Sequence, residues 1–364
     1  MSSLPPGAVL ASTVTSAAAF GFMPVAVHFD LFDILAKIKG PASGEDVLVA
    51  YRNSKGHKAE DNIPCTYDTL YAMSGLGFVD ITGDDLYAAN AITKHLATMP
   101  SAQHGALHFT TEALLGAAFL MRKLKAGNFE YPFKELDTPY QYAYHLMGQE
   151  ELAKQHTYSI MAAEGRMDSF NHFMVGKFMK TNTAPDRLRA LGYDLQSVLD
   201  EARGAVSATM VDIGGGRGEL LLDIKAAYPD LQASDLVVQE FNQDIIEIPG
   251  ITLTTWNYKE DSPQPIKGAL IYHLAHILHN LADLEAARLL QKIAEAMAPH
   301  SRILIHEFAK NVNYAKMHSA MVALYAGRER SAVEWRQMAA LAGLQMTFEA
   351  YPEVGEGLIE MRKL

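Results

Sequence analysis

The pattern of apolar and polar positions changes near residue 208. Beyond that point, short apolar runs alternate with longer segments whose apolar residues recur at helical spacing. Alternation of this kind is typical of a parallel sheet whose strands are joined by crossover helices. It predicts strands at 209–213, 235–240, 251–256, 268–274, 302–308, 344–350 and 357–363, with the clearest helices at 283–297 and 332–342.

The last two predicted strands are joined only by Pro352 to Glu356. This connection is too short for a crossover helix, so the pair is expected to form an antiparallel hairpin. The segment therefore predicts an α/β fold, with a Rossmann-like sheet of seven strands that ends in that hairpin.

The N-terminal part has a different pattern. Residues 8–38 predict a helix whose first part is apolar on nearly all sides, and such a helix needs cover from its own core or from a second subunit. We favour a homodimer interface. Residues 40–62 are polar and predict a loop, and helical spacing returns at 67–73.

A helix followed by a hairpin with a polar tip is a winged-helix arrangement. Residues 75–81 and 86–89 supply the two predicted strands, with a turn between them. Winged helices often bind DNA, but this one carries Asp80, Asp84 and Asp85 where a DNA-binding surface needs Lys or Arg. We therefore interpret it as a scaffold.

Residues 104–200 look mainly helical and are rich in aromatic residues, Met and His. Such residues at helical spacing are usually plain core, but their density could also furnish an apolar pocket above a cofactor. Both interpretations stay open at this point.

Composition narrows the function classes. The formal net charge of -11 disfavours a nucleic-acid partner, because no basic run compensates for it. A single cysteine, Cys65, excludes an intrachain disulfide and indicates a reducing compartment. The N-terminus lacks the basic region of a signal peptide, and no uncharged apolar run is long enough to span a membrane. We expect a cytoplasmic enzyme.

The most informative motif is a strand that runs into a glycine cluster, residues 210–218, with a helix directly after it. Glycines there let a ligand lie on bare backbone. Asp212 precedes Gly214 and Gly216, and an acidic residue suits a cationic amino acid end better than a pyrophosphate. Glu240 ends the second strand, where a carboxylate holds ribose hydroxyls. A nucleoside with an amino acid tail is S-adenosylmethionine (SAM); the alternative is an ordinary βα turn.

A second constellation follows the fourth and fifth strands. His279 lies beyond the fourth strand, Glu307 ends the fifth, and Glu329 lies in a loop before the next helix. In an open parallel sheet the ligand lies off the carboxyl ends of the strands. A histidine held there by two carboxylates is a candidate general base, because they orient its ring and favour its charged form.

These motifs resemble the plant and fungal SAM-dependent O-methyltransferases, which include caffeic acid methyltransferases and many fungal polyketide-tailoring enzymes. The likeness covers most of the chain, weakly before Tyr140 and strongly from Val211 to Leu344. The segments that carry it are 211–218, 239–241, 267–269, 276–279 and 327–331.

The resemblance implies a homodimer that takes SAM and a small-molecule substrate and releases S-adenosylhomocysteine. It implies that His279 deprotonates an acceptor hydroxyl between Glu307 and Glu329, and that Phe170 and Met174 help to clamp an aromatic substrate. The implied cofactor-binding residues are Asp212, Gly214, Gly216, Glu240, Phe241, Asn257 and Tyr258. The implied domains are a dimerisation and winged-helix-like domain (1–100), a helical linker that contributes to the substrate pocket (101–200) and the SAM-binding catalytic domain (201–364).

Five positions depart from the family pattern, and two of them are Glu240, one methylene longer than the usual Asp, and Asn257, which replaces the Asp of the adenine loop. Asn280 and Leu281 replace the usual Asp and Trp after the catalytic histidine, and Ala275 replaces a Lys or Arg. These departures leave room for an alternative, a SAM-binding pericyclase or isomerase that transfers no methyl group. A zinc site at His273, His276 and His279 is disfavoured, because no regular ligand set accompanies these residues. For His273 and His276 we expect a structural role.

Overall fold

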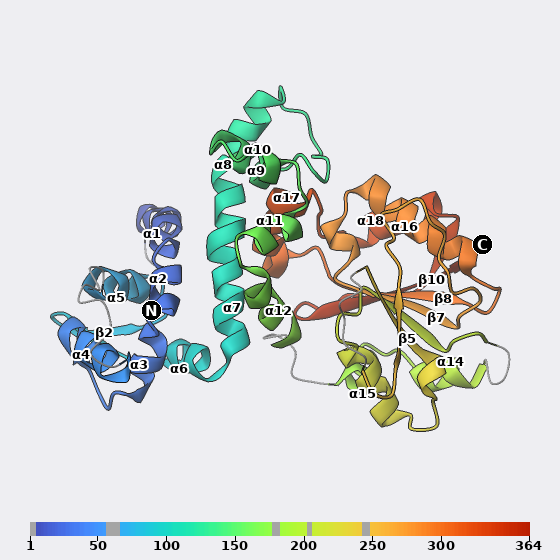
Figure 1. Ribbon diagram of the computed structural model, residues 1–364, viewed down its shortest axis with the longest axis horizontal. Coiled ribbons are helices and arrows are strands. Elements are labelled where there is room, and N and C mark those ends of the chain that lie inside the picture. The colour runs from blue at the N-terminus through green and yellow to red at the C-terminus, as the bar shows by residue number, and fades with distance from the viewer. Residues whose placement is uncertain (1–4, 56–65, 177–182, 202–205, 242–247) are drawn as a thin grey trace. The chain divides into compact units, whose positions relative to one another are not determined.

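The computed structural model describes residues 5–55, 66–176, 183–201, 206–241 and 248–364. The chain packs into two compact units (Figure 1). Unit 1 comprises Met1–Phe119 and Tyr158–Phe178, and unit 2 comprises Leu120–Thr157 and Met179–Leu364. The division into domains at residues 100 and 200 stays a prediction.

Unit 2 is built on a seven-stranded sheet with the order β6-β5-β4-β7-β8-β10-β9. The strands are β4 (Met210–Ile213), β5 (Leu236–Glu240), β6 (Thr252–Thr255), β7 (Ile271–Ala275), β8 (Arg302–Phe308), β9 (Leu344–Ala350) and β10 (Glu356–Lys363). β4 to β8 are parallel, whereas β10 pairs antiparallel with both β8 and β9. The predicted seven strands and their C-terminal hairpin are confirmed.

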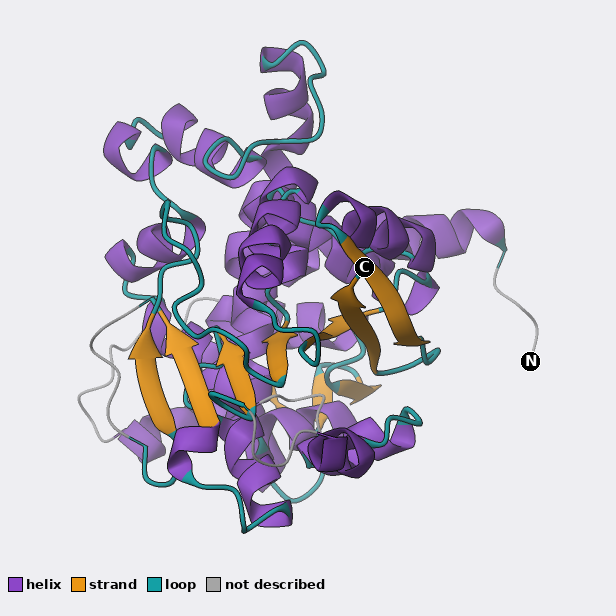
Figure 2. Cartoon of the chain, turned by 90° about the vertical axis from the view of Figure 1, so that its right-hand side faces the viewer, coloured by secondary structure: helices purple, strands orange, loops and turns teal. Residues whose placement is uncertain are grey.

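Helices cover both faces of this sheet (Figure 2). Alternate strand residues such as Val211 and Tyr272 pack against α16 and α18, while Met210 and Ile271 face α13 to α15. Buried on both sides, the parallel strands are almost continuously apolar, which is why they stand out in the sequence. The helices of unit 2 are α9 (Pro139–Leu146), α10 (Glu150–Ala153), α13 (Ala184–Ala190), α14 (Leu195–Glu201), α15 (Glu219–Ala227), α16 (Asp283–Ala296), α17 (Ala315–Tyr325) and α18 (Ala332–Leu341).

Unit 1 is mainly helical and holds a small antiparallel sheet with the order β1-β3-β2. Its strands are β1 (Ala42–Ser43), β2 (Asp80–Gly83) and β3 (Leu86–Ala88). Its helices are α1 (Pro6–Phe20), α2 (Met23–His28), α3 (Leu31–Lys37), α4 (Gly44–Lys55), α5 (Thr66–Gly75), α6 (Ala91–Thr98), α7 (Pro100–His108) and α12 (Met167–Gly176). α8 (Leu114–Ala126) and α11 (Thr157–Ala163) cross the boundary between the units. The expected helix-then-hairpin order is present, and the winged-helix class stays a prediction.

Two expectations for the N-terminal part were wrong. Residues 8–38 form three helices rather than one, since the chain turns at Gly21–Phe22 and again at Asp30, whose φ of 52° is left-handed. The polar stretch from residue 40 is helical over Gly44–Lys55 instead of a loop. Ser43 begins this helix because its backbone N–H and hydroxyl both donate to the Asp46 carboxylate. Residues 56–62 of that predicted loop lie outside the described residues.

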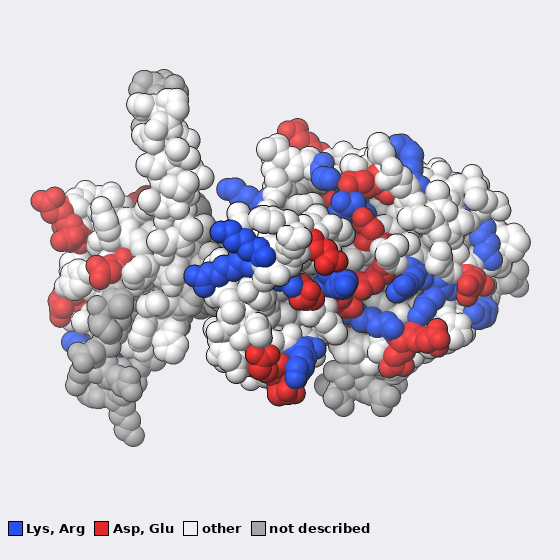
Figure 3. All heavy atoms as spheres, turned by 90° about the horizontal axis from the view of Figure 1, so that it is seen from above, with Lys and Arg blue, Asp and Glu red and all other residues white. Residues whose placement is uncertain are grey.

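The surface is mixed in charge. On the face shown in Figure 3, Lys and Arg side chains lie interspersed with Asp and Glu side chains. Within the described residues, no helix is both long and apolar enough to cross a bilayer.

Candidate active site

The glycine turn lies at the centre of the sheet in unit 2. Strand order reverses at β4, which has β5 on one side and β7 on the other, and ligands of such sheets bind off the carboxyl ends at this switch point. Gly214, Gly216 and Gly218 have φ of 68°, 59° and 71°, a region that other residues seldom adopt. The sequence thus places three glycines where the backbone requires them.

Two carboxylates flank the turn. Asp212 is buried at the end of β4, and its Oδ1 lies 2.7 Å from Nδ1 of His273. Glu240 ends β5 and accepts a 2.6 Å hydrogen bond from the Gly216 N–H. Burial raises the pKa of Glu240 and the negative charge of Asp212 adds to this rise, whereas the Gly216 N–H opposes it. This pair of carboxylates favours a ligand with hydroxyl donors and a positive charge.

The segment after β6 forms a tight turn. The Asn257 side chain accepts from the Lys259 N–H and donates to Glu260. Tyr258 is half-buried and packs against the sheet's core, with its ring edge-on to Trp256. Phe241, beyond Glu240, is exposed. These three predicted cofactor residues therefore follow β5, which pairs with β4, and β6, which is the next strand outward.

His279 lies in a short 3-10 turn, Leu278–Asn280, beyond β7. Its Nδ1 is 2.9 Å from Glu329 Oε1 and 3.5 Å from Glu307 Oε2, and all three residues are buried. Glu307 Oε1 also accepts from the backbone N–H groups of Leu278 and His279, at 2.9 and 3.2 Å. The structure brings the three predicted catalytic side chains together, with both carboxylates on the same ring nitrogen.

The electrostatics of this cluster favour a charged imidazole. Burial alone lowers the pKa of His279, but the carboxylates of Glu307 and Glu329 outweigh it and raise the pKa to about 9. Burial raises the pKa of Glu307, and the cationic form of His279 opposes that rise. With Nδ1 engaged by the carboxylates, Nε2 is the nitrogen left for a ligand.

Residues 327–330 hold the histidine turn from a second direction. A Cβ on Gly327 would lie 1.9 Å from the backbone oxygen of His279, so only glycine fits there. The guanidinium of Arg330 is buried and donates to the carbonyls of Leu278 and Leu281, at 2.7 and 2.8 Å. Both residues lie in segment 327–331, which carries the family resemblance, but the resemblance implies no role for them. Their contacts depend on a tertiary approach that local pattern does not reveal.

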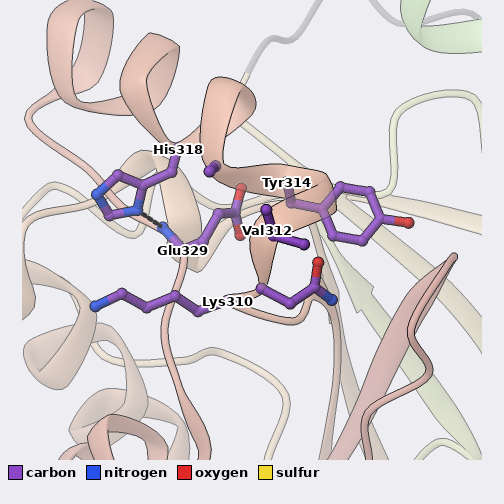
Figure 4. Close-up of a pocket in the computed structure, with 7 residues that line it drawn as sticks. Lys310, Val312, Tyr314, His318 and Glu329 are labelled. Carbon is purple, nitrogen blue, oxygen red and sulfur yellow. Dashed lines mark hydrogen bonds between the residues drawn. The ribbon is translucent and has the colours of Figure 1, made fainter. Parts of the chain in front are cut away.

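A pocket of about 260 Å³ opens beside Glu329. Figure 4 shows Lys310, Val312, Tyr314 and His318 around it. Nδ1 of His318 accepts from the Glu329 backbone N–H at 3.2 Å, and burial lowers the pKa of His318. A neutral His318 matches this acceptor role, and the bond helps to fix the backbone that carries Glu329.

His276 turns out of β7 with a φ of 55°, and its ring lies 5.2 Å from that of His279. Within the described residues, His276, His279 and Glu307 form a group whose ligand-type atoms lie within 4.8 Å of one another. However, Nε2 of His276 bonds to Glu356 at 2.5 Å, and Nδ1 of His279 faces Glu329. These nitrogens are committed to carboxylates, which favours a structural cluster over a metal site. Asn280 Nδ2 donates to the His276 carbonyl.

Phe170 and Met174, the predicted substrate residues, lie on α12 in unit 1. Phe170 contacts His108 and Tyr158, with ring centres 5.0 and 5.3 Å away. Met174 is exposed. α7 continues into a π-helical segment, Phe109–Ala113, a form common at functional sites. These residues belong to a different compact unit from His279.

Comparison with known proteins assigns the chain to a family. The family model of the O-methyltransferase domain matches residues 187–345. The O-methyltransferase bfoE of Aspergillus brasiliensis is 55% identical over 360 residues, which is 98% of this chain and 96% of that protein.

Solved structures share the fold over nearly the whole chain. A structure of LepI in complex with SAM has a TM-score of 0.79 at 22% identity and covers 99% of this chain and 90% of its own. The mitomycin 7-O-methyltransferase MmcR has a TM-score of 0.72 at 19% identity and covers 98% of each chain. At these identities the likeness shows the fold alone.

Proposed function

The chain belongs to the SAM-dependent O-methyltransferases, and we propose that it methylates a phenol or enol hydroxyl of an aromatic or polyketide-like small molecule, with His279 as the general base. The observation that carries the proposal is the buried His279 whose Nδ1 faces both Glu307 and Glu329. A histidine oriented through one nitrogen presents the other to an acceptor.

SAM would lie at the glycine turn. Because Gly214 and Gly216 have no side chains, SAM could lie directly against the protein backbone there. The Asp212 carboxylate matches the ammonium group at the methionine end of SAM. Glu240 would accept from the ribose hydroxyls, while Asn257, Tyr258 and Phe241 would surround the adenine. The buried Asp212 and the half-buried Glu240 suit this ligand because it brings both hydroxyl donors and cationic charge.

The chemical step balances without another reactant. A lone pair of the acceptor oxygen forms the new O–CH₃ bond as the S–CH₃ bond breaks, and the sulfonium becomes the thioether of S-adenosylhomocysteine. The hydroxyl proton passes to Nε2 of the neutral form of His279, which becomes the main form only as pH rises through the pKa of about 9, and Glu307 and Glu329 stabilise the resulting imidazolium. Alignment of oxygen, methyl and sulfur supplies much of the remaining rate.

The acceptor would be flat and apolar. Phe170 lies among the aromatic rings of unit 1, and the exposed Met174 is a flexible, polarisable contact one turn further along α12. Both residues would clamp an aromatic substrate. The name of the 55% identical relative supports transfer to oxygen.

We further propose that the protein is a homodimer. None of the residues of α1 is buried, although the helix is rich in Ala and Val. A second copy that covers this helix would remove its apolar surface from water. The helix and hairpin of unit 1 would then serve as a scaffold.

A pericyclase that binds SAM without consuming it is the alternative. One specific observation leaves room for it, since Asn280 stands where the family pattern has an acidic residue. The deciding experiment incubates purified protein with methyl-labelled SAM and an extract of small-molecule candidates. We expect label in a product together with S-adenosylhomocysteine, both detected by mass spectrometry.

The matched variants are His279→Ala and His279→Gln, which should abolish label transfer while SAM still binds. Near-normal turnover in either variant would contradict the base assignment. Bound SAM without label transfer, together with a product of unchanged mass, would favour the pericyclase.

A further inference from the structure

Three buried polar side chains form a hydrogen-bonded row beneath the glycine turn. Nδ1 of His273 lies 2.7 Å from Asp212 Oδ1, and its Nε2 lies 2.7 Å from Nδ1 of His306. Asp212 and His273 are directly paired on neighbouring strands β4 and β7, and His306 lies on the next strand, β8. His273 has no exposed surface, and Asp212 and His306 are each 2% exposed.

The row has one consistent direction of donation. A carboxylate only accepts, so Nδ1 of His273 must carry the hydrogen that points at Asp212. In its neutral form His273 then accepts through Nε2, and His306 donates from Nδ1. The row is thus a fixed set of donors that ends at the Asp212 carboxylate.

This row is separate from the His279 cluster. Side chains alternate along a strand, so His306 and Glu307 point to opposite faces of the sheet. Asp212 shares its face with Met210, which packs under α13 to α15, whereas Val211 packs under α16 and α18. Neither His273 nor His306 therefore has a part in the proposed proton transfer.

The Asp212 carboxylate is also held from above. A Cβ on Gly215 would lie 2.4 Å from Asp212 Oδ2, so the turn folds directly over this oxygen. One carboxylate oxygen thus bonds to His273 and the other lies under the glycine backbone. A buried carboxylate oxygen that loses its hydrogen-bond donor is no longer held in position, and its desolvation is no longer compensated.

We propose that His273 is a positioning residue of the cofactor site, which keeps the Asp212 carboxylate hydrogen-bonded and oriented for the ammonium group of the amino acid end of SAM. The inference rests on the proposed binding of SAM at the glycine turn. It predicts that His273 matters for ligands with an α-amino group and not for the nucleoside part.

The test compares two ligands by isothermal titration calorimetry on the full chain: SAM, and methylthioadenosine, which lacks the amino acid end. The variants are His273→Phe, which removes both hydrogen bonds, and His273→Asn, whose amide nitrogen takes the place of Nδ1 and still donates to Asp212. Loss of a charge-assisted hydrogen bond should weaken SAM binding to His273→Phe by about tenfold or more. Binding of methylthioadenosine should change less than about twofold, since it makes no contact with Asp212.

His273→Asn should retain the preference of the wild type for SAM over methylthioadenosine. If His273→Phe does not fold, His273→Gln replaces it, because its longer amide reaches toward His306 and leaves Asp212 without a donor. A merely structural His273 would lower thermal stability and leave the ratio of the two affinities unchanged, which overturns the inference. A wild type that binds both ligands equally also overturns it. A wild type that binds neither ligand contradicts the proposed function instead.

Discussion

The two carboxylates at His279 differ in what they hold. Glu329 Oε1 makes the 2.9 Å contact with Nδ1, and the Glu329 backbone is fixed by His318. Glu307 uses Oε1 for two backbone N–H groups of the histidine turn, and only its Oε2 faces the ring, at 3.5 Å. At the scale of single residues, Glu307 and Glu329 both favour the charged ring, Glu329 sets its orientation, and Glu307 also fixes the turn itself.

Glu329→Gln tests this division. The amide keeps the size of the side chain but removes a negative charge, so the imidazolium loses a stabilising partner and turnover should fall by about 10²-fold. Because Glu329 raises the pKa of His279, the rising limb of the pH–kcat profile should also move to lower pH. The measurement is kcat between about pH 5.5 and 10, taken at intervals of about half a pH unit.

Glu295→Gln, an exposed position on α16, is the matched control and should behave as wild type. An unchanged pH profile in Glu329→Gln would show that its carboxylate does not act on the histidine. A lower rate without a shifted profile would then reflect packing alone.

The same pKa makes a prediction about stability. The folded-state pKa of His279 is raised from 6.5 to about 9, so the charged imidazole stabilises the fold below pH 6.5. This contribution is lost as pH rises through about 9, and a shift of this size corresponds to at most about 3 kcal/mol. Urea unfolding at pH 6.5 and pH 9.5 measures the loss. The loss of unfolding free energy between these two pH values should be smaller in His279→Gln than in the wild type. An equal loss in both proteins would contradict the ion pairing of His279 with Glu307 and Glu329.

At the scale of elements, the loop 327–330 holds the histidine turn, Leu278–Asn280, in place. The loop before α18 places Gly327 against the His279 carbonyl, Glu329 on its ring and Arg330 on the carbonyls of Leu278 and Leu281. Arg330 in turn pairs with Asp283, at the start of α16. The position of the base thus depends on two loops at the carboxyl ends of the sheet rather than on β7 alone.

Gly327→Ala should separate these two loops. The added methyl group cannot fit 1.9 Å from a backbone oxygen, so either the 327–330 segment or the histidine turn must shift. We expect kcat to fall about tenfold or more and the free energy of unfolding to fall by about 1–3 kcal/mol. SAM affinity, measured by calorimetry, should be nearly unchanged, because the glycine turn follows β4 and is not part of either loop.

Gly75→Ala is the control, because a Cβ at the end of α5 meets no atom within 4 Å. It should leave both activity and stability close to wild type. Full activity in Gly327→Ala would mean that the clamp has no part in placing His279.

The sequence predicted the sheet well and the clamp poorly, for physical reasons. Buried parallel strands are continuous apolar runs, so β4, β5 and β8 fall within a residue or so of their predicted bounds. His279, Glu307 and Glu329 follow strands or precede a helix, which is enough to place them at one edge of the sheet. Arg330 and Gly327 act through carbonyls of a distant turn, and α4 depends on a cap at Ser43. The spacing of apolar and polar residues along the chain does not predict contacts of this kind.

At the scale of the whole molecule, α1 exposes a group of apolar side chains to solvent. Val9, Leu10 and Val14 are 49%, 63% and 59% exposed, and Leu10 and Val14, four residues apart, lie on the same side of the helix. The formal net charge of -11 opposes nonspecific association, so a contact between copies needs a specific apolar patch. A second copy seated on α1 is the occupant we propose.

The double variant Leu10→Glu with Val14→Glu tests this proposal. Two buried carboxylates without partners would cost several kcal/mol at an apolar interface, so a dimer of about micromolar affinity should become monomeric. Light scattering coupled to size-exclusion chromatography measures the mass, which should drop from twice that of the 40.0 kDa chain to that of one chain. Val354→Glu, at an exposed apolar position elsewhere, should leave the mass unchanged. A monomeric wild type would contradict the proposal that a second copy of the chain covers α1.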